Sequence, residues 1–350
     1  MDSVFQKAEY LFENKKYEET ILVCKDILEE DTCDENLQIK TLYLLSKSFK
    51  LIGKINEQCE SLILVYKLQP KNYELAKDIG VAYQTIGNNE LARKYYKESI
   101  SINNQYSRAL NNLGGLEILS NHLNEAIDLF NKAIQFNPSL LQPRLNLIKS
   151  YLKIGCYDKG ELLAHQSFEH FPKSYILFFL YSKSLYLQKK LEEAEIAIKN
   201  SIDINNQYQD SYLHYSSILI DQNKLDEAEI LIKNVINSDP NNHLYHNLLG
   251  VILKKKGEYD DAMIHFNRAL QYKPDFALSM SNIAAIMLEN DEIENAEIKL
   301  RQAIKLNPNL SEPLLLFAYA PLFRPDQIGK YFNVSGIVSD EFSEKLQAKI

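Results

Sequence analysis

Apolar residues recur along the chain at the three- to four-residue spacing that is typical of amphipathic helices. The stretch 244–257 predicts one helix, with an apolar face made of Leu249, Val251, Ile252 and Leu253. The stretch 258–271 predicts a second helix, with an apolar face made of Ala262, Ile264, Phe266, Ala269 and Leu270. Gly257 is suited to end the first helix, and Pro274 cannot continue the second. The pattern therefore predicts a helical hairpin.

This hairpin pattern recurs every 34 residues. Alanine stands at one place of successive repeats, at Ala92, Ala126, Ala194, Ala228, Ala262 and Ala296, with Gly160 in the remaining place. Proline follows the second helix at Pro70, Pro138, Pro172, Pro240, Pro274 and Pro308. One hairpin cannot bury its own apolar face, so a fixed period of this length predicts a solenoid whose neighbouring hairpins cover one another.

The repeat at 243–276 resembles the tetratricopeptide repeat. The matching residues are Leu249, Gly250, Gly257, Ala262, Phe266, Ala269 and Pro274, although the early tryptophan common in that family is absent. The resemblance covers residues 1–310 as about nine units: 1–34, 39–72, 73–106, 107–140, 141–174, 175–208, 209–242, 243–276 and 277–310. It implies an all-α fold, a right-handed superhelical solenoid of tetratricopeptide-like helix hairpins with an irregular C-terminal cap at 311–350.

Composition and charge exclude several classes of protein. The formal net charge is -8, so the basic domain usual in nucleic-acid binding is missing, and we expect no nucleic-acid partner. The start has no signal-peptide pattern and no long apolar run occurs, so we expect no membrane partner. The four cysteines form no CxxC pair, which predicts reduced thiols in a cytoplasmic protein.

No set of residues predicts catalysis, and we expect neither an enzyme nor a cofactor. His243 and His246 share one helix face, with His214 in the preceding unit, but no cysteine or paired acid nearby supports a metal site. Acidic pairs such as those at 192–193 and 260–261 begin second helices, where they favour the positive end of the helix dipole.

The family resemblance implies that first helices line a concave groove, with the second, fifth, ninth and twelfth residues of each unit facing it. We therefore predict a partner-binding groove made of Lys40, Tyr43, Lys47, Lys50, Lys77, Arg108, Asn111, Asn112, Asn146, Lys149, Phe179, Lys183 and Tyr186. Acids at these places are few, namely Glu74 and Asp210. One interpretation is a set of ordinary solvated lysines, and the other is a cationic groove that selects an acidic peptide.

A second feature of the groove is its asparagine content. Asn111, Asn112 and Asn146 could form part of a ladder that holds a peptide backbone through side-chain amides, an arrangement that some members of the family use. The alternative is that asparagine serves as an ordinary surface and capping residue in a chain that is rich in it.

The repeat fails after Pro308. The segment 311–323 is expected to begin as an apolar helix, which either is covered by the last 25 or so residues or contacts a partner or a second copy, giving a dimer. We thus predict a non-catalytic scaffold or adaptor that binds an extended, acidic segment of a protein or peptide. The alternative is a recruitment subunit or remnant of a protein- or glycan-modifying enzyme, of glycosyltransferase or sulfotransferase type, with the catalytic domain elsewhere.

Overall fold

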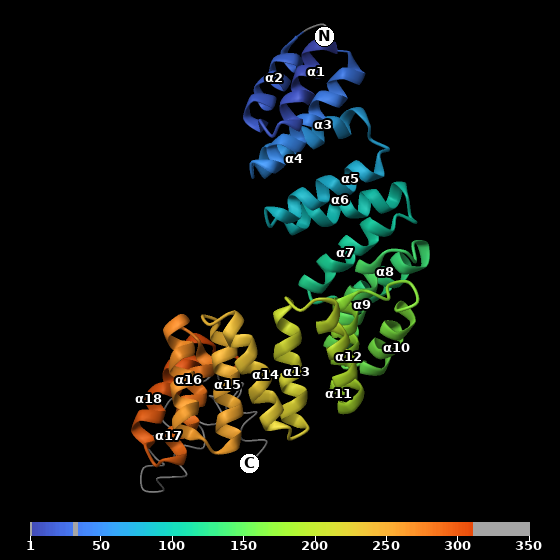
Figure 1. The fold of residues 1–350 in the computed structure, drawn as a ribbon. Helices are drawn as coiled ribbons and strands as arrows, with labels where there is room; N and C mark the ends of the chain where they lie inside the picture. Colours follow the sequence, from blue (N-terminus) through green and yellow to red (C-terminus); the bar gives the residue numbers. More distant parts are fainter. Residues whose placement is uncertain (1, 31–33, 311–350) are drawn as a thin grey trace, which may run out of the picture. The chain divides into compact units, whose positions relative to one another are not determined.

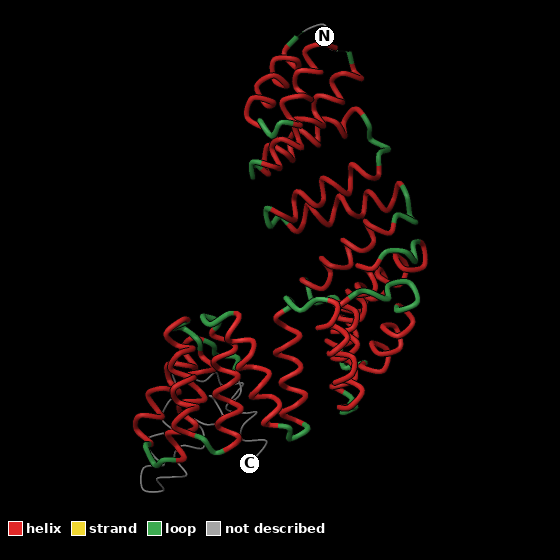
Figure 2. The backbone as a smooth tube through the Cα atoms, viewed as in Figure 1, coloured by secondary structure: helices red, strands yellow, loops and turns green. Residues whose placement is uncertain are grey.

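The computed structural model describes residues 2–30 and 34–310, and every element in these ranges is a helix joined to the next by a short loop (Figures 1 and 2). The helices follow one another as pairs, in which odd-numbered helices are called first helices and even-numbered ones second helices. The chain divides into two compact units, Met1–Gln188 and Lys189–Ile350, which are described separately. The predicted all-α class is confirmed.

The N-terminal unit holds eleven helices. They are α1 (Asp2–Glu13), α2 (Tyr17–Glu29), α3 (Glu35–Leu51), α4 (Ile55–Leu68), α5 (Tyr73–Thr85), α6 (Asn89–Ile102), α7 (Ser107–Leu119), α8 (Leu123–Phe136), α9 (Leu141–Lys153), α10 (Tyr157–Ser167) and α11 (Tyr175–Leu187). Within the unit each helix packs mainly on its neighbours in sequence, as expected for a stack of hairpins.

The C-terminal unit holds the remaining described helices. They are α12 (Leu191–Ile204), α13 (Gln209–Asp221), α14 (Leu225–Ser238), α15 (His243–Lys256), α16 (Tyr259–Tyr272), α17 (Ala277–Glu289) and α18 (Ile293–Leu306). The predicted stop at Gly257 is confirmed: it has a φ of 81°, and its N–H bonds to the carbonyls of Leu253 and Lys254. The helix and cap predicted within 311–350, and the dimer contact through them, lie outside the described residues.

In three hairpins a glycine on the first helix makes room for an aromatic ring from the second helix. A Cβ on Gly250 would lie 2.6 Å from Cε1 of Phe266, and one on Gly80 would lie 2.6 Å from the ring of Tyr96. Phe266 and Tyr96 are fully buried, so each ring fills the space that its glycine leaves. The spacing of Gly250, Ala262 and Phe266 in the repeat therefore reflects this contact between the two helices of a hairpin.

One member of the predicted apolar face does not belong to the core. Ile264 is 49% exposed, whereas Ala262 and Phe266 on either side of it are buried. The three-to-four spacing of apolar residues in α16 is carried by Ala262, Phe266 and Ala269, which leaves Ile264 on the outer side of the helix. The prediction that Ile264 packs inward was therefore wrong.

First helices form the inner layer of each unit. Consecutive first helices pack on each other in the pairs α1–α3, α5–α7, α7–α9, α9–α11, α13–α15 and α15–α17. Within either unit, no two consecutive second helices of the described chain pack in this way. Since first helices approach each other more closely than second helices do, each stack curves toward its first helices.

Three of the four cysteines lie within the described ranges, and all three are free thiols. Burial raises the pKa of the Cys24 thiol to about 12, so this side chain behaves as a small apolar core residue. Within residues 2–30 and 34–310, no helix combines the length and the apolar character that crossing a lipid bilayer requires.

Candidate functional site

The predicted groove residues all lie on first helices of the N-terminal unit. Lys40, Tyr43, Lys47 and Lys50 are on α3, Lys77 is on α5, Arg108, Asn111 and Asn112 are on α7, Asn146 and Lys149 are on α9, and Phe179, Lys183 and Tyr186 are on α11. Lys40, Lys47, Lys50, Arg108 and Lys149 are exposed. The places chosen from the repeat thus put cationic side chains on the inner layer of helices.

Three of these residues share a pocket at the N-terminal end of the unit. The pocket has a volume of about 520 Å³ and lies between α1 and α3. Its lining is Phe5, Gln6 and Glu9 from α1, with Lys40, Tyr43, Leu44 and Lys47 from α3. The lining therefore includes two ammonium groups, one carboxylate and two aromatic rings.

Tyr43 is held in place at the edge of this pocket. Nδ2 of Asn72, the residue that caps the start of α5, donates to its hydroxyl over 3.4 Å. Burial is the main cause that raises the pKa of the Tyr43 hydroxyl, with the nearby carboxylate of Asp78 adding to it. The phenol is therefore neutral and can itself donate a hydrogen bond to a ligand.

Two other predicted groove residues offer less than their sequence places imply. The ammonium of Lys77 forms an ion pair with Asp78, the next residue on α5, so its charge is already partly compensated. Phe179 is only 5% exposed and lies beneath Lys183, whose Nζ is 4.8 Å from the ring centroid. Phe179 therefore does not line the surface, because its apolar ring packs inward while the lysine covers it.

The asparagines predicted on α7 and α9 form a chain of side-chain hydrogen bonds. Nε2 of Gln142 donates to Oδ1 of Asn146 over 2.9 Å, and Nδ2 of Asn146 donates to Oδ1 of Asn111 over 3.0 Å. Nδ2 of Asn111 in turn donates to Oδ1 of Asn112 over 3.3 Å. Each amide orients the next, so the chain is ordered before any ligand arrives.

The same amide contact occurs in the C-terminal unit, outside the residues of the predicted groove. Nδ2 of Asn282 on α17 lies 3.3 Å from Oδ1 of Asn247 on α15, and the two residues are 35 apart in sequence, as are Asn146 and Asn111. Nζ of Lys254 donates to Oδ1 of Asn282 over 2.9 Å. The repeat therefore places an asparagine pair between consecutive first helices in both units.

Ion pairs between hairpins surround a few buried carboxylates. Glu195 is 8% exposed, and its oxygens lie 2.6 Å from Nζ of Lys199 and 2.8 Å from Nζ of Lys224. Burial alone would raise the pKa of the Glu195 carboxyl, but the hydrogen bonds from Lys199 and Lys224 outweigh it and hold that pKa at about 2. The contact ties α12 to the turn before α14 and is structural rather than catalytic.

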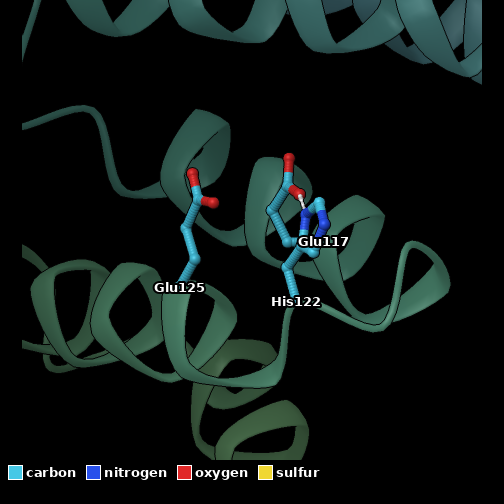
Figure 3. A group of neighbouring side chains, drawn as sticks. All are labelled: Glu117, His122 and Glu125. Carbon is cyan, nitrogen blue, oxygen red and sulfur yellow. Dashed lines mark hydrogen bonds and ion pairs between the residues drawn. The ribbon is translucent and has the colours of Figure 1, made fainter.

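A second buried carboxylate lies in a group that could in principle hold a metal ion. Ligand atoms of Glu117, His122 and Glu125 all lie within 4.8 Å of one another (Figure 3). Nδ1 of His122 is 2.8 Å from one Glu117 oxygen, and Nε of Arg93 is 2.7 Å from the other. Both oxygens of Glu117 are therefore occupied by protein partners, which account for the cluster without an ion.

Histidines meet across helices rather than along one helix. His243 packs its ring edge on Phe276, with centroids 4.8 Å apart, and so does not pair with His246. His246 instead stacks on His265, and their Nδ1 atoms are 3.1 Å apart. Nε2 of His246 lies 2.9 Å from the carbonyl oxygen of Pro240, so it carries the proton and donates. The contact between His246 on α15 and His265 on α16 could not be predicted from the spacing of histidines in the sequence.

Comparison with known proteins places these helices in a family. Models of the tetratricopeptide repeat match residues 78–106, 107–140, 185–252 and 243–276. The chain is 27% identical over 130 residues to the BBSome complex member BBS4 of Bos taurus, a match that covers 37% of this chain and 24% of that protein. The match therefore spans about a quarter of the curated relative.

Solved structures show the same fold. A tetratricopeptide repeat protein from Parabacteroides merdae is 18% identical, with a TM-score of 0.56 and coverage of 70% of this chain and 97% of that one. Yeast Tom70 is 13% identical, with a TM-score of 0.56 and coverage of 99% of this chain and 93% of that one. Four stretches of the chain thus match tetratricopeptide-repeat models, and its stacked helix pairs have the fold of tetratricopeptide repeat proteins.

Proposed function

We propose that the chain is a non-catalytic scaffold or adaptor that holds an extended, acidic segment of a partner protein on the first helices of its N-terminal unit. The observation that carries the proposal is the pocket between α1 and α3, in which Lys40, Tyr43 and Lys47 converge. The relative named as a member of the BBSome complex supports a role in protein assembly, as the fold itself does.

The chemistry of the pocket supports an acidic segment with a neighbouring apolar side chain. Lys40 and Lys47 outnumber Glu9, so a carboxylate entering the pocket gains more attraction than repulsion. The rings of Phe5 and Tyr43 provide apolar contact beside these charges. Because α1 and α3 already pack on each other, the surface is formed in advance, and little ordering cost falls on the scaffold.

The amide chain on α7 and α9 supports the same use farther along the stack. Side-chain amides offer both a donor and an acceptor, which match the N–H and C=O of an extended backbone. The amides of Asn111, Asn112 and Asn146 already bond to one another, so a bound segment would share or replace these contacts. We infer that these amides set the position of the bound segment along the groove more than they add to its binding affinity.

The proposal is tested with the Lys40→Glu, Lys47→Glu double variant of the full chain. Its matched control is Lys25→Glu, Lys132→Glu, which makes the same charge change at exposed lysines of the second helices α2 and α8. Proteins retained from a lysate of the native organism are identified by mass spectrometry at low and high salt. We expect wild type and the control to retain an acidic protein at low salt, and the pocket variant not to retain it.

Two results would contradict the proposal. If the pocket variant retained every partner as well as wild type does, the pocket would not be the binding site. Recovery of a protein- or glycan-modifying enzyme with all three forms would favour the recruitment subunit instead, with the cationic groove playing no part in the assembly.

A further inference from the structure

A row of exposed isoleucines follows the second helices of the C-terminal unit. Its members are Ile196 on α12, Ile230 on α14, Ile264 on α16 and Ile298 on α18, each 34 residues from the next. They are 64%, 62%, 49% and 57% exposed, respectively. Because each occupies the same place of its repeat, the stack of helices arranges them as one line on the outer side of the unit. These four residues are called the isoleucine row.

The fold does not require an apolar residue at this place. Among the equivalent residues of the N-terminal unit, Glu60, Lys94 and Asp128 are charged, and Leu162 is apolar and exposed. Isoleucine is also a poorer helix former than lysine or glutamate at an exposed position, because its branched side chain loses rotamer freedom. Single exposed apolar residues are common on protein surfaces, but four in register form a continuous feature, which is typical of an interaction surface.

Charges along the row are arranged asymmetrically. One turn before each isoleucine, at the start of its helix, the surface carries the exposed acids Glu192, Glu193, Asp226, Glu227, Asp260, Asp261 and Glu294. One turn after, the row carries Lys199, Lys233, Arg268 and Arg301. Lys199, Lys233 and Arg301 are each paired with a glutamate of their own helix, at 2.6, 2.5 and 2.7 Å respectively, and among the acids Asp226 is paired with Lys256 at 2.9 Å. The seven acids therefore outnumber the four cations that lie one turn from the row.

We propose that the isoleucine row is a docking surface for a basic amphipathic segment of a partner protein. The apolar face of such a segment would cover the isoleucines, and its lysines or arginines would face the acids that flank them. This surface lies on second helices, so it is separate from the first-helix pocket and does not depend on the function proposed for that pocket. The same acids disfavour an anionic membrane surface.

The test uses the full-length chain and three fluorescent synthetic peptides. The first peptide is an amphipathic helix with leucines on one face and lysines on the other. The second replaces the lysines with glutamates, and the third replaces the leucines with serines. Binding is measured by fluorescence anisotropy for wild type, for Ile230→Ser with Ile264→Ser, and for a control, Leu51→Ser with Leu119→Ser, at exposed leucines of the N-terminal unit.

The leucine–lysine peptide is expected to bind wild type and the control at least about tenfold more tightly than either other peptide. The isoleucine variant should lose this binding by about tenfold, since its apolar contacts are removed while every acid remains. Equal binding of the serine–lysine peptide, or no loss in the isoleucine variant, would overturn the proposal. So would concentration-dependent dimers in sedimentation that the isoleucine variant abolishes, because the row would then bind a second copy of the chain.

Discussion

The ring of Phe130 on α8 occupies the space beside Gly114 on α7, and a Cβ on Gly114 would come within 2.7 Å of Cε1 of that ring. A Cβ on the next residue, Gly115, would meet no atom within 4 Å. Two adjacent glycines of one helix therefore have opposite roles, since one is required by packing and the other is tolerated.

Alanine substitutions at these two glycines should change stability in opposite directions. Gly114→Ala is expected to lower the free energy of unfolding by about 1–3 kcal/mol, because the buried ring of Phe130 must move. Gly115→Ala is expected to raise it by about 0.5–1 kcal/mol, because alanine is the better helix former. Thermal unfolding followed by circular dichroism measures both, and a loss of stability in Gly115→Ala would contradict the assignment.

Arg144 and His246 occupy the same place in repeats of the two units. Nη2 of Arg144 lies 3.4 Å from the carbonyl oxygen of Pro138, and Nε2 of His246 lies 2.9 Å from that of Pro240. Arg144 is 7% exposed, its Nε has no hydrogen-bond partner, and burial lowers the pKa of its guanidinium. A guanidinium is thus buried where an imidazole makes the same bond in another repeat.

Replacing Arg144 should not weaken the protein. Arg144→His keeps a donor for the Pro138 carbonyl and removes a poorly compensated charge, so we expect the free energy of unfolding to rise by about 1 kcal/mol. Lys149→His, at an exposed place of the same helix, is the matched control and should leave stability unchanged. A marked fall in the melting temperature of Arg144→His would show that the guanidinium is stabilising.

The histidine pair makes stability depend on pH. Burial, together with the neighbouring His246, Arg268 and Lys233, lowers the pKa of His265 from 6.5 to about 4, against an opposing effect of Asp261. The unfolded chain therefore binds more protons than the folded one between pH 4 and 6.5. The stability that the unprotonated His265 contributes is therefore complete above pH 6.5. As the pH falls toward 4, the free energy of unfolding decreases by up to ~3 kcal/mol.

His265→Gln should flatten this pH dependence. The glutamine cannot titrate, so the melting temperature of the variant should fall less than that of wild type between pH 6.5 and pH 4. His170→Gln, at an exposed histidine, serves as the control and should follow wild type. If the melting temperatures of wild type and His265→Gln fell equally between pH 6.5 and pH 4, His265 would not be the cause of the pH dependence.

Glu195 should stabilise the start of the C-terminal unit at all but acidic pH. Its pKa is lowered from 4.5 to about 2, so the stabilisation is complete above pH 4.5 and is lost as the pH falls through 2. Glu195→Gln is expected to cost about 2 kcal/mol at neutral pH, because the ion pairs with Lys199 and Lys224 are lost. Amide hydrogen exchange should show the loss of protection in α12 to α14, whereas unchanged exchange there would contradict the role.

Much of the architecture can be predicted from the sequence, because the residue type at each place of the repeat indicates how that place packs in the fold. Gly250 and Ala262 indicate a close approach of helices, Phe266 indicates the ring that fills the remaining space, and Pro274 indicates the end of the hairpin. The periodicity of 34 residues then extends this local information along the chain.

The surface is harder to predict, because the direction of a side chain depends on neighbours that the repeat does not specify. Tyr43 and Phe179 hold the same place of their units, yet Tyr43 lines a pocket and Phe179 is buried under Lys183. Their difference follows from the phenol hydroxyl, which needs a polar partner and finds one in Asn72. The outward position of Ile264 was missed for a related reason, since an apolar residue was assumed to be a core residue.

Within each unit, the described helices pack only on helices one or two places away in sequence. No described contact joins the two ends of a unit, so a gain or loss of one whole period would leave the remaining interfaces with partners of the same kind. The length of either binding face is therefore free to change in steps of one repeat. In evolutionary terms, duplication or loss of one repeat would lengthen or shorten either proposed binding face without a change in how the remaining hairpins pack.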